Sequence, residues 1–249
     1  STDRTMSVLS ELKIKNLKFK ILKQDHKGAG TARNLGVKHA VGDILVFVDA
    51  DMTFAPDFIE KLIEPISGDS TLPERLRGAR GTFSKEEYVL NWDNIWARCW
   101  NTNEGWMEQR RHPKHYPDKQ KVFRAILKSE FDRVGGFDPK RGYTDDWSLS
   151  ERLGYEASSA VGAVFYHKNP DALLKVFRQA RWAAKRRYKL GVLGYFVSLV
   201  RVSFPISFLS GLSSAIRHQT LAIIPFKIVS DFGAFVGILE FWLLGDFKK

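Results

Sequence analysis

Two aspartates follow directly on an apolar run, and their types and spacing indicate metal chemistry. Residues 44–48 read "ILVFV" and lead to Asp49 and Asp51, with Ala50 between them. Ligands of open α/β sheets bind beyond the carboxyl ends of the strands, and strand alternation directs both side chains to one side. Neighbouring carboxylates repel each other, so Mg²⁺ or Mn²⁺ would stabilise them while leaving coordination positions for substrate phosphates. The alternative is a chance Asp-x-Asp triplet in a chain of 249 residues.

A glycine-containing segment precedes this triplet, at residues 25–36, "DHKGAGTARNLG". Its position before a predicted helix favours phosphate binding by backbone N–H groups near Gly28. Lys27 and Arg33 flank the segment, and cations there would suit a diphosphate. The spacing matches neither GxGxxG nor GxxxxGK[ST], which disfavours dinucleotide binding and a P-loop. A left-handed turn followed by a capped helix is the alternative.

Strand and helix signals alternate along the chain and must position these side chains. Apolar runs at residues 18–24, 43–49, 121–127 and 159–167 predict strands, and residues 31–41, 56–66, 145–154 and 171–190 have helical spacing. This alternation is typical of βαβ units, whose helices cover a parallel sheet. We therefore expect the α/β class with a mostly parallel central sheet.

The two motif segments together resemble a known family. "KGAGTARNLGVKHAVGDILVFVDADM" is similar to the sugar-nucleotide half of the family 2 glycosyltransferases of GT-A fold, and "FRAILKSEFDRVGGFDPKRGYTDDWSLSERLG" resembles their acceptor half. The resemblance covers roughly residues 1–190. It implies a GT-A-like fold, a nucleotide-diphosphate sugar donor, Mg²⁺ or Mn²⁺, and transfer with inversion at the anomeric carbon.

The resemblance also implies roles for individual aspartates. Asp51 would hold the metal, and Asp49 would contact the ribose or the metal shell. Asp146 matches the catalytic base that takes the acceptor proton, and Asp145 would orient the acceptor. The alternative for Asp145 and Asp146 is helix capping, because acidic side chains favour helix N-termini.

Two later features carry further expectations. "RQARW" resembles the QxxRW element of processive members, in which Arg181 would reach the diphosphate and Trp182 would stack at the acceptor sugar. Arg178 stands where those members have Gln, so processive and single transfer both stay open, and an amphipathic surface helix is an equally good interpretation. His167 ends a predicted strand where related enzymes can add a metal ligand; the alternative is a structural histidine.

The beginning of the sequence departs from the family pattern. Members usually begin with a strand and an acidic turn that receives the nucleotide base, and of that turn only Asp3 is present here. We therefore expect the N-terminal strand to be missing from this sequence. If the natural chain began at Ser1, the base pocket would be open and activity would be doubtful.

The last third of the chain indicates the partner surface. Residues 167–249 hold 13 Lys or Arg against 4 Asp or Glu, a net charge of +9. This segment therefore carries most of the formal net charge of +11 of the whole chain. Its apolar stretches are interrupted at Arg201 and Arg217, and no uninterrupted run reaches the roughly 18 residues of a confident spanning helix. We expect a glycosyltransferase domain at residues 1–189 and a membrane-associated helical tail at residues 190–249. Spanning helices that tolerate one arginine are the alternative.

These observations combine into one expected function and two alternatives. The sequence predicts a metal-dependent inverting glycosyltransferase acting on a lipid-linked or polysaccharide acceptor at the cytoplasmic face of an anionic membrane. The single Cys99 excludes an internal disulfide, which fits a reducing compartment. The alternatives are an inactive membrane scaffold or sugar-nucleotide binder, and a basic nucleic-acid-binding protein. The long apolar runs disfavour the latter, because a phosphate-binding groove does not need them.

Overall fold

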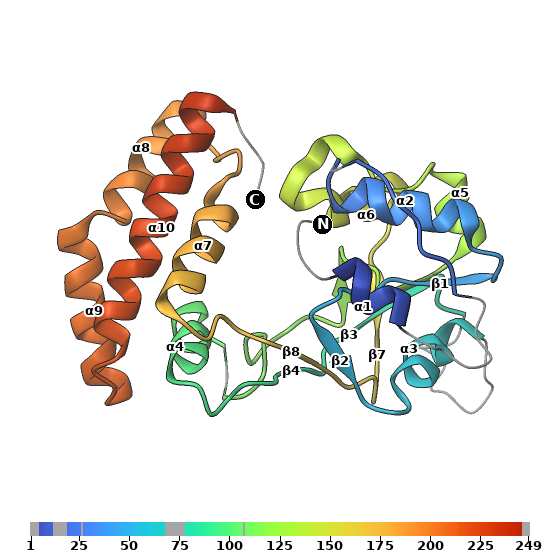
Figure 1. Ribbon diagram of the computed structural model, residues 1–249, viewed down its shortest axis with the longest axis horizontal. Coiled ribbons are helices and arrows are strands. Elements are labelled where there is room, and N and C mark those ends of the chain that lie inside the picture. The colour runs from blue at the N-terminus through green and yellow to red at the C-terminus, as the bar shows by residue number, and fades with distance from the viewer. Residues whose placement is uncertain (1–4, 12–18, 26, 68–77, 107, 246–249) are drawn as a thin grey trace.

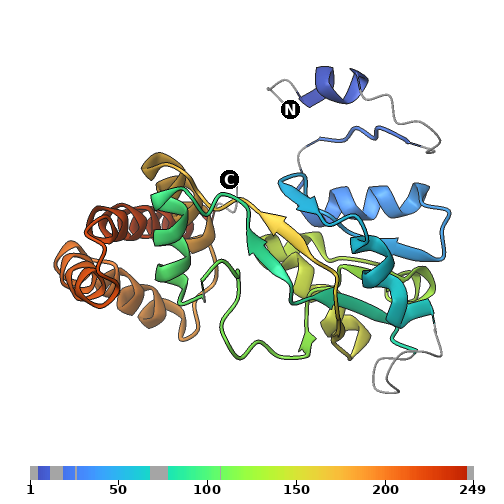
Figure 2. The same ribbon diagram turned by 90° about the horizontal axis from the view of Figure 1, so that it is seen from below.

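The computed structural model describes residues 5–11, 19–25, 27–67, 78–106 and 108–245. An α/β part carries two sheets, and a mainly helical part lies beside it (Figures 1 and 2). The helices are α1 (Thr5–Glu11), α2 (Ala29–His39), α3 (Phe58–Ser67), α4 (Ile95–Glu104), α5 (Lys128–Arg133), α6 (Asp145–Leu153), α7 (Leu173–Ala184), α8 (Gly191–Arg201), α9 (Phe204–His218) and α10 (Ile223–Leu244).

The strands form a larger and a smaller sheet. The larger sheet has the order β1-β6-β3-β7-β5 and the smaller sheet has the order β2-β8-β4. The strands are β1 (Ile44–Val46), β2 (Met52–Phe54), β3 (Gly81–Ser84), β4 (Glu87–Val89), β5 (Lys119–Gln120), β6 (Ala125–Leu127), β7 (Ala157–Ala160) and β8 (Phe165–His167). The α/β class is therefore confirmed.

The direction of the strands differs from the expectation of a mostly parallel sheet, which is not confirmed. Among the described strands of the larger sheet, β6 runs antiparallel to both β1 and β3, β5 runs antiparallel to β7, and β3 and β7 are parallel. The βαβ interpretation assumed that each crossover returns the chain in one direction, whereas β6 enters between β1 and β3 in the opposite direction. The strand expected at residues 18–24 is likewise not found, because described residues 19–25 have no regular secondary structure.

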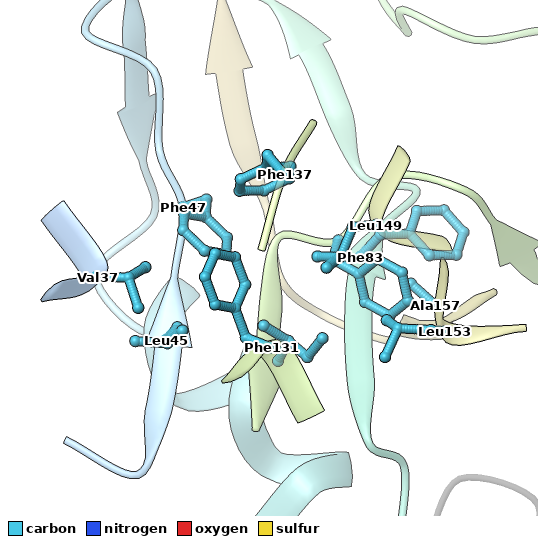
Figure 3. Packing of buried hydrophobic residues seen from close by; sticks show 11 residues of the cluster. Val37, Leu45, Phe47, Phe83, Phe131, Phe137, Leu149, Leu153 and Ala157 are labelled. Carbon is cyan, nitrogen blue, oxygen red and sulfur yellow. The ribbon is translucent and has the colours of Figure 1, made fainter. Parts of the chain in front are cut away.

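Helices cover both faces of the larger sheet, and this packing positions the ends of α2 and α6. Neighbouring residues of β6 point to opposite faces: Ile126 packs with the cluster that includes α2, α5 and α6, and Ala125 packs with the cluster that includes α3. Figure 3 shows the first cluster, in which Phe47 meets Phe137 with ring centroids 5.1 Å apart. The helices predicted around residues 31–41, 56–66, 145–154 and 171–190 are confirmed as α2, α3, α6 and α7.

Small residues allow close packing in the helical part. A Cβ atom on Gly237 of α10 would lie 2.0 Å from the carbonyl oxygen of Arg181 on α7, so only glycine permits this approach. The tryptophan-containing face of α4 joins the same core, where Trp100 meets Phe226 of α10 edge to face. The predicted boundary at residue 189 falls between α7 and α8, which both contact α10, and it stays a prediction.

Within the described residues, no single helix is both long and apolar enough to cross a membrane. The pair α8 and α9, bent by 56° at the break between them, has the length and composition to do so together.

Candidate functional site

Arg33 on α2 lies among three aspartates from two distant segments. Its Nη2 atom is 3.0 Å from Oδ1 of Asp49, which follows β1, and its Nη1 atom donates a hydrogen bond to Oδ1 of Asp146. Asp145 is close as well, with its Oδ1 atom 3.6 Å from Nη1. The structure therefore brings together the two motifs that the sequence placed about 100 residues apart.

Arg124 is a second cation at this site, and it is not among the site residues predicted from the sequence. Its Nη1 atom lies 3.0 Å from Oδ2 of Asp49, and backbone pairing places it there, because Phe47 N–H donates to the Arg124 carbonyl over 2.8 Å. Burial alone would raise the pKa of Asp49, but Arg124 and Arg33 outweigh it and lower that pKa. A lone arginine within the apolar run "VFRAIL" was the signal that could have revealed it.

Asp145 holds the beginning of α2. Its Oδ2 atom accepts a hydrogen bond of 2.5 Å from the Gly30 N–H, and its side chain is 9% exposed. A Cβ atom on residue 30 would lie 2.8 Å from this oxygen, so glycine is needed for the approach. The carboxylate suits the positive end of the helix dipole. The contact of Asp145 with the start of α2 was not among the expectations, and its predicted contact with the acceptor stays a prediction.

Asp146 is more accessible than Asp145, with 34% of its side chain exposed. Burial raises its pKa, and the charges of Asp145 and Asp49 act in the same direction, while Arg33 and Arg124 partly offset them. A carboxylate with a raised pKa accepts a proton more readily at neutral pH. The geometry and the electrostatics therefore suit Asp146 as a general base.

The predicted phosphate-binding segment lies at the start of α2. Gly28 is the residue before this helix, with φ of 87°, a conformation that glycine adopts without strain. Lys27 is exposed. Because Asp145 already occupies the Gly30 N–H, phosphate binding by this helix end stays a prediction.

Asp51 and His167 form a second group beside the Arg33 cluster. The Oδ2 atom of Asp51 lies 2.9 Å from Nε2 of His167, and antiparallel pairing places Met52 opposite His167. Glu87 of β4 contacts the other ring nitrogen, with Oε1 at 3.1 Å from Nδ1. Burial would raise the pKa of Glu87, but the hydrogen bond with His167 and the charge of Arg111 outweigh it and lower the pKa. Glu87 is not among the site residues predicted from the sequence.

This pair fits two positions of a divalent-metal site. Adjacent ligands at about 2.1 Å from an octahedral ion are separated by about 3.0 Å, close to the observed Asp51–His167 distance. Asp49 was also predicted as a ligand; its two oxygens accept from Arg33 and Arg124, and its role as a metal ligand stays a prediction. Within the described ranges, no group of three or more His, Cys, Asp or Glu side chains is arranged to hold a metal. The remaining ligands would therefore be water and substrate oxygens.

The predicted residues of "RQARW" lie in the helical part. The Nε atom of Arg181 is 2.8 Å from Oε2 of Glu240 on α10, and Trp182 is half-buried on α7. Arg181 thus pairs with a carboxylate of a neighbouring helix, and its contact with a diphosphate stays a prediction. Asp3 lies outside the described residues.

Comparisons with known proteins show the family of the chain. A family model described as glycosyl transferase family 2 matches residues 1–141, which is more than half of the chain. The chain belongs to glycosyl transferase family 2. Polypeptide N-acetylgalactosaminyltransferase 6 of Bos taurus is 27% identical to this family 2 chain over 202 residues, covering 70% of the chain and 32% of the relative.

Two further proteins are similar over different lengths. Dolichol-phosphate mannosyltransferase of Pyrococcus furiosus is 37% identical over 81 residues, covering 32% of this chain and 23% of the relative. The structure of the mannosyltransferase PcManGT from Pyrobaculum calidifontis in complex with GDP-Man and Mn²⁺ has a TM-score of 0.46 and 16% identity, covering 90% of this chain and 69% of that chain. The family 2 chain spans about a third of the length of the N-acetylgalactosaminyltransferases that it matches.

Proposed function

We propose that this family 2 chain transfers a sugar, with inversion, from a nucleotide-diphosphate donor to a hydroxyl or phosphate acceptor. The observation that carries the proposal is the meeting of Asp49 and Arg33 from the first motif with Asp146 from the second. Membership of family 2 supports the same reaction class.

The chain's own residues divide the reaction between them. Arg33 and Arg124 supply the cations that bind the donor diphosphate, exchanging contacts with aspartates for contacts with phosphate oxygens. Asp146 accepts the proton of an acceptor hydroxyl while the acceptor oxygen forms its bond to the anomeric carbon. The bond from that carbon to the diphosphate breaks on the opposite side, which inverts the configuration. For a phosphate acceptor the attacking oxygen is already ionised, so the reaction needs no general base and Asp146 takes up no proton.

We further propose that Asp51 and His167 hold Mg²⁺ or Mn²⁺. Their 2.9 Å separation supports this assignment, and carboxylate and imidazole are both suitable ligands. When bound, the ion would neutralise the charge of the departing nucleoside diphosphate, as a Lewis acid.

A donor screen tests the proposal. Nucleotide sugars are scanned for thermal stabilisation of the full chain with Mn²⁺, Mg²⁺ or a chelator, because a ligand that binds the folded state raises stability by mass action. We expect one class of nucleotide sugar to stabilise the chain only with metal, and Asp51→Asn to abolish this effect. Asp43→Asn is the matched control, since Asp43 is exposed at the other end of β1.

The outcomes separate the proposal from its alternative. Transfer or slow hydrolysis of the stabilising donor supports the enzyme, whereas donor binding without any turnover supports an inactive sugar-nucleotide binder. Full turnover in chelator-treated wild-type protein would contradict the metal assignment.

We also propose that the chain acts at the cytoplasmic face of an anionic membrane, with α8 and α9 lying on the lipid. Residues 185–222 contain six Lys or Arg and no Asp or Glu. Arg186, Arg187 and Lys189 are exposed, whereas Lys185 is buried and pairs with Glu240 over 3.1 Å. Large apolar side chains that are exposed on the two helices are Val192, Leu193, Phe196, Val197, Val200, Phe204, Ile206, Phe208, Leu209, Leu212 and Ile216. Apolar area flanked by cations is what an interfacial helix needs.

Vesicle sedimentation tests this location. We expect the full chain to sediment with vesicles containing phosphatidylserine and to sediment less with purely zwitterionic vesicles, because each Lys or Arg near an anionic surface contributes about 1 kcal/mol. Phe196→Ser combined with Leu209→Ser should reduce binding, whereas Val41→Ser, at an exposed valine in the α/β part, should not. Equal loss in both variants, or no vesicle binding by the wild type, would contradict the proposal.

A further inference from the structure

We propose that Glu87 is a positioning residue that fixes the ring orientation and the tautomer of His167, so that the Nε2 lone pair faces the metal position beside Asp51. This inference rests on the metal assignment in the proposed function. It adds a residue that lies in neither motif and that does not itself contact the metal.

Strand pairing places Glu87 beside the imidazole. β4 and β8 are parallel, with Glu87 opposite Phe165 and Val89 opposite His167. Glu87 and His167 therefore lie on one face of the smaller sheet, at diagonal positions that long side chains can bridge. The observed distance of 3.1 Å between Oε1 and Nδ1 shows that they do. Figure 1 shows β2, β8 and β4 side by side.

The chemistry of imidazole gives this contact its consequence. A neutral imidazole carries one N–H, and its other nitrogen is the one that can bind a metal. A carboxylate accepts a hydrogen bond but cannot donate one, so Glu87 selects the tautomer with the proton on Nδ1. Nε2 lies 2.9 Å from Oδ2 of Asp51, which is a hydrogen-bond distance for the metal-free protein. A metal ion would displace the proton shared there and bind the Nε2 lone pair, while Glu87 retains the proton on Nδ1. Carboxylates placed in this way orient metal-binding histidines in general.

Arg111 holds Glu87 in place. The backbone N–H of Arg111 donates to the backbone carbonyl of Glu87 over 3.0 Å, which aligns the two residues. The Arg111 guanidinium also donates to the same Oε1 atom that contacts His167. The four side chains thus form a continuous series from Arg111 through Glu87 and His167 to Asp51.

A purely structural role is the competing explanation. Glu87 and Arg111 are both largely buried, with side chains 21% and 15% exposed, and a buried ion pair needs no metal to be retained. The two explanations differ in one observable: only a positioning role changes how His167 coordinates a metal.

The experiment measures Mn²⁺ binding and nitrogen coordination on the full chain. Affinity is measured by titration with Mn²⁺ alone, and pulsed electron paramagnetic resonance detects the coupling of a directly bound imidazole nitrogen. We expect that coupling in the wild type and its loss in His167→Ala. Glu87→Ala should weaken Mn²⁺ affinity by about 10- to 100-fold and reduce the nitrogen coupling. Glu87→Gln keeps an acceptor oxygen and should show a smaller loss in both.

Glu86→Gln is the matched control. The neighbouring Glu86 carboxylate accepts from the Gly162 N–H over 2.8 Å, so this substitution should leave affinity and coupling unchanged. If Glu87→Ala does not fold, as judged by its unfolding transition, Glu87→Gln decides: weaker affinity supports the inference, and wild-type affinity with wild-type coupling overturns it.

Failure of the inference is distinguishable from failure of the proposed function. Wild-type nitrogen coupling that persists in Glu87→Ala, with unchanged affinity, overturns the inference and leaves the metal assignment intact. Mn²⁺ binding by the wild type without nitrogen coupling overturns both the inference and the His167 assignment. Absence of Mn²⁺ binding overturns the inference and the metal dependence together, whereas donor transfer is tested separately.

Discussion

The Arg33 cluster and the Arg181–Glu240 pair both combine cations with carboxylates. Carboxylates are in excess in the first, and cations are in excess in the second. At the end of β1, Arg33 faces three aspartates, whereas in the helical part Arg181 and Lys185 share one carboxylate, Glu240. Two carboxylates of the Arg33 cluster differ in their pKa: Arg124 and Arg33 lower the pKa of Asp49, whereas burial, together with the charges of Asp145 and Asp49, raises that of Asp146. Pairs of acids pushed apart in this way are typical of acid–base sites. The helical pair has no such division and joins α7 to α10.

The largest expected effect is on turnover and concerns Asp146 of the Arg33 cluster. Asp146→Asn should reduce turnover by about 10²- to 10⁴-fold, because asparagine cannot accept the acceptor proton. Donor binding should persist, since the diphosphate contacts are assigned to other residues. Turnover is measured with the donor found by the stability screen, and donor affinity is measured by the same thermal shift.

Asp132→Asn is the control for this substitution, because Asp132 is an exposed aspartate of α5 that pairs with Lys128. Its turnover should match the wild type. Normal turnover in Asp146→Asn would reduce the Arg33 cluster to a structural ion-pair network, equivalent to the one in the helices.

A smaller effect is expected on the stability of the helical part. Glu240→Gln should lower the free energy of unfolding by about 2 kcal/mol, because Lys185, which is 5% exposed, loses its charged partner. Turnover per folded molecule should be unchanged. Urea unfolding measures the first quantity and an assay at a temperature far below the transition measures the second.

The opposite result for Glu240→Gln would restore the interpretation of "RQARW" as part of the site. Loss of turnover with unchanged stability would mean that Arg181 acts on substrate. The control is Asp171→Asn, because Asp171 pairs with Lys175, which is exposed at the start of α7. This variant should change the free energy of unfolding by no more than a few tenths of a kcal/mol and should leave turnover unchanged.

Local patterns sufficed to predict α2, α3, α6 and α7 and the position of the first two aspartates. Apolar spacing defined α2 and α6, and Pro56 with Asp57 signalled the start of α3. The apolar run before Asp49 indicated that its carboxylate lies at a strand end. These features depend on neighbours within one or two turns of chain, which a sequence displays directly.

Partners supplied by distant strands could not be predicted in the same way. Glu87 and Arg124 reach the site only because β4 pairs with β8 and β6 pairs with β1, and these registers have no local signature. Strand direction was missed for the same reason, since a short apolar run is equally compatible with parallel and antiparallel neighbours. Asp145 illustrates a further limit: acids at a helix start predict capping, but the helix that Asp145 caps lies 115 residues earlier.

The smallest expected effect concerns the pH dependence of the Arg33 cluster. Asp146 acts as a base only when ionised, so kcat/KM should fall as the pH decreases through its pKa. Because burial and nearby aspartates raise that pKa, the decrease should begin at a higher pH than for an exposed aspartate. Asp145→Asn removes one of the raising charges while its amide oxygen can still accept from the Gly30 N–H. The acid limb of the kcat/KM profile should therefore shift to lower pH in this variant, with the temperature of unfolding as the check that α2 is intact. An unchanged or upward-shifted limb would show that a group other than Asp146 sets the acid limb, and the contrast between the two arginine–carboxylate regions would then lose its acid–base basis.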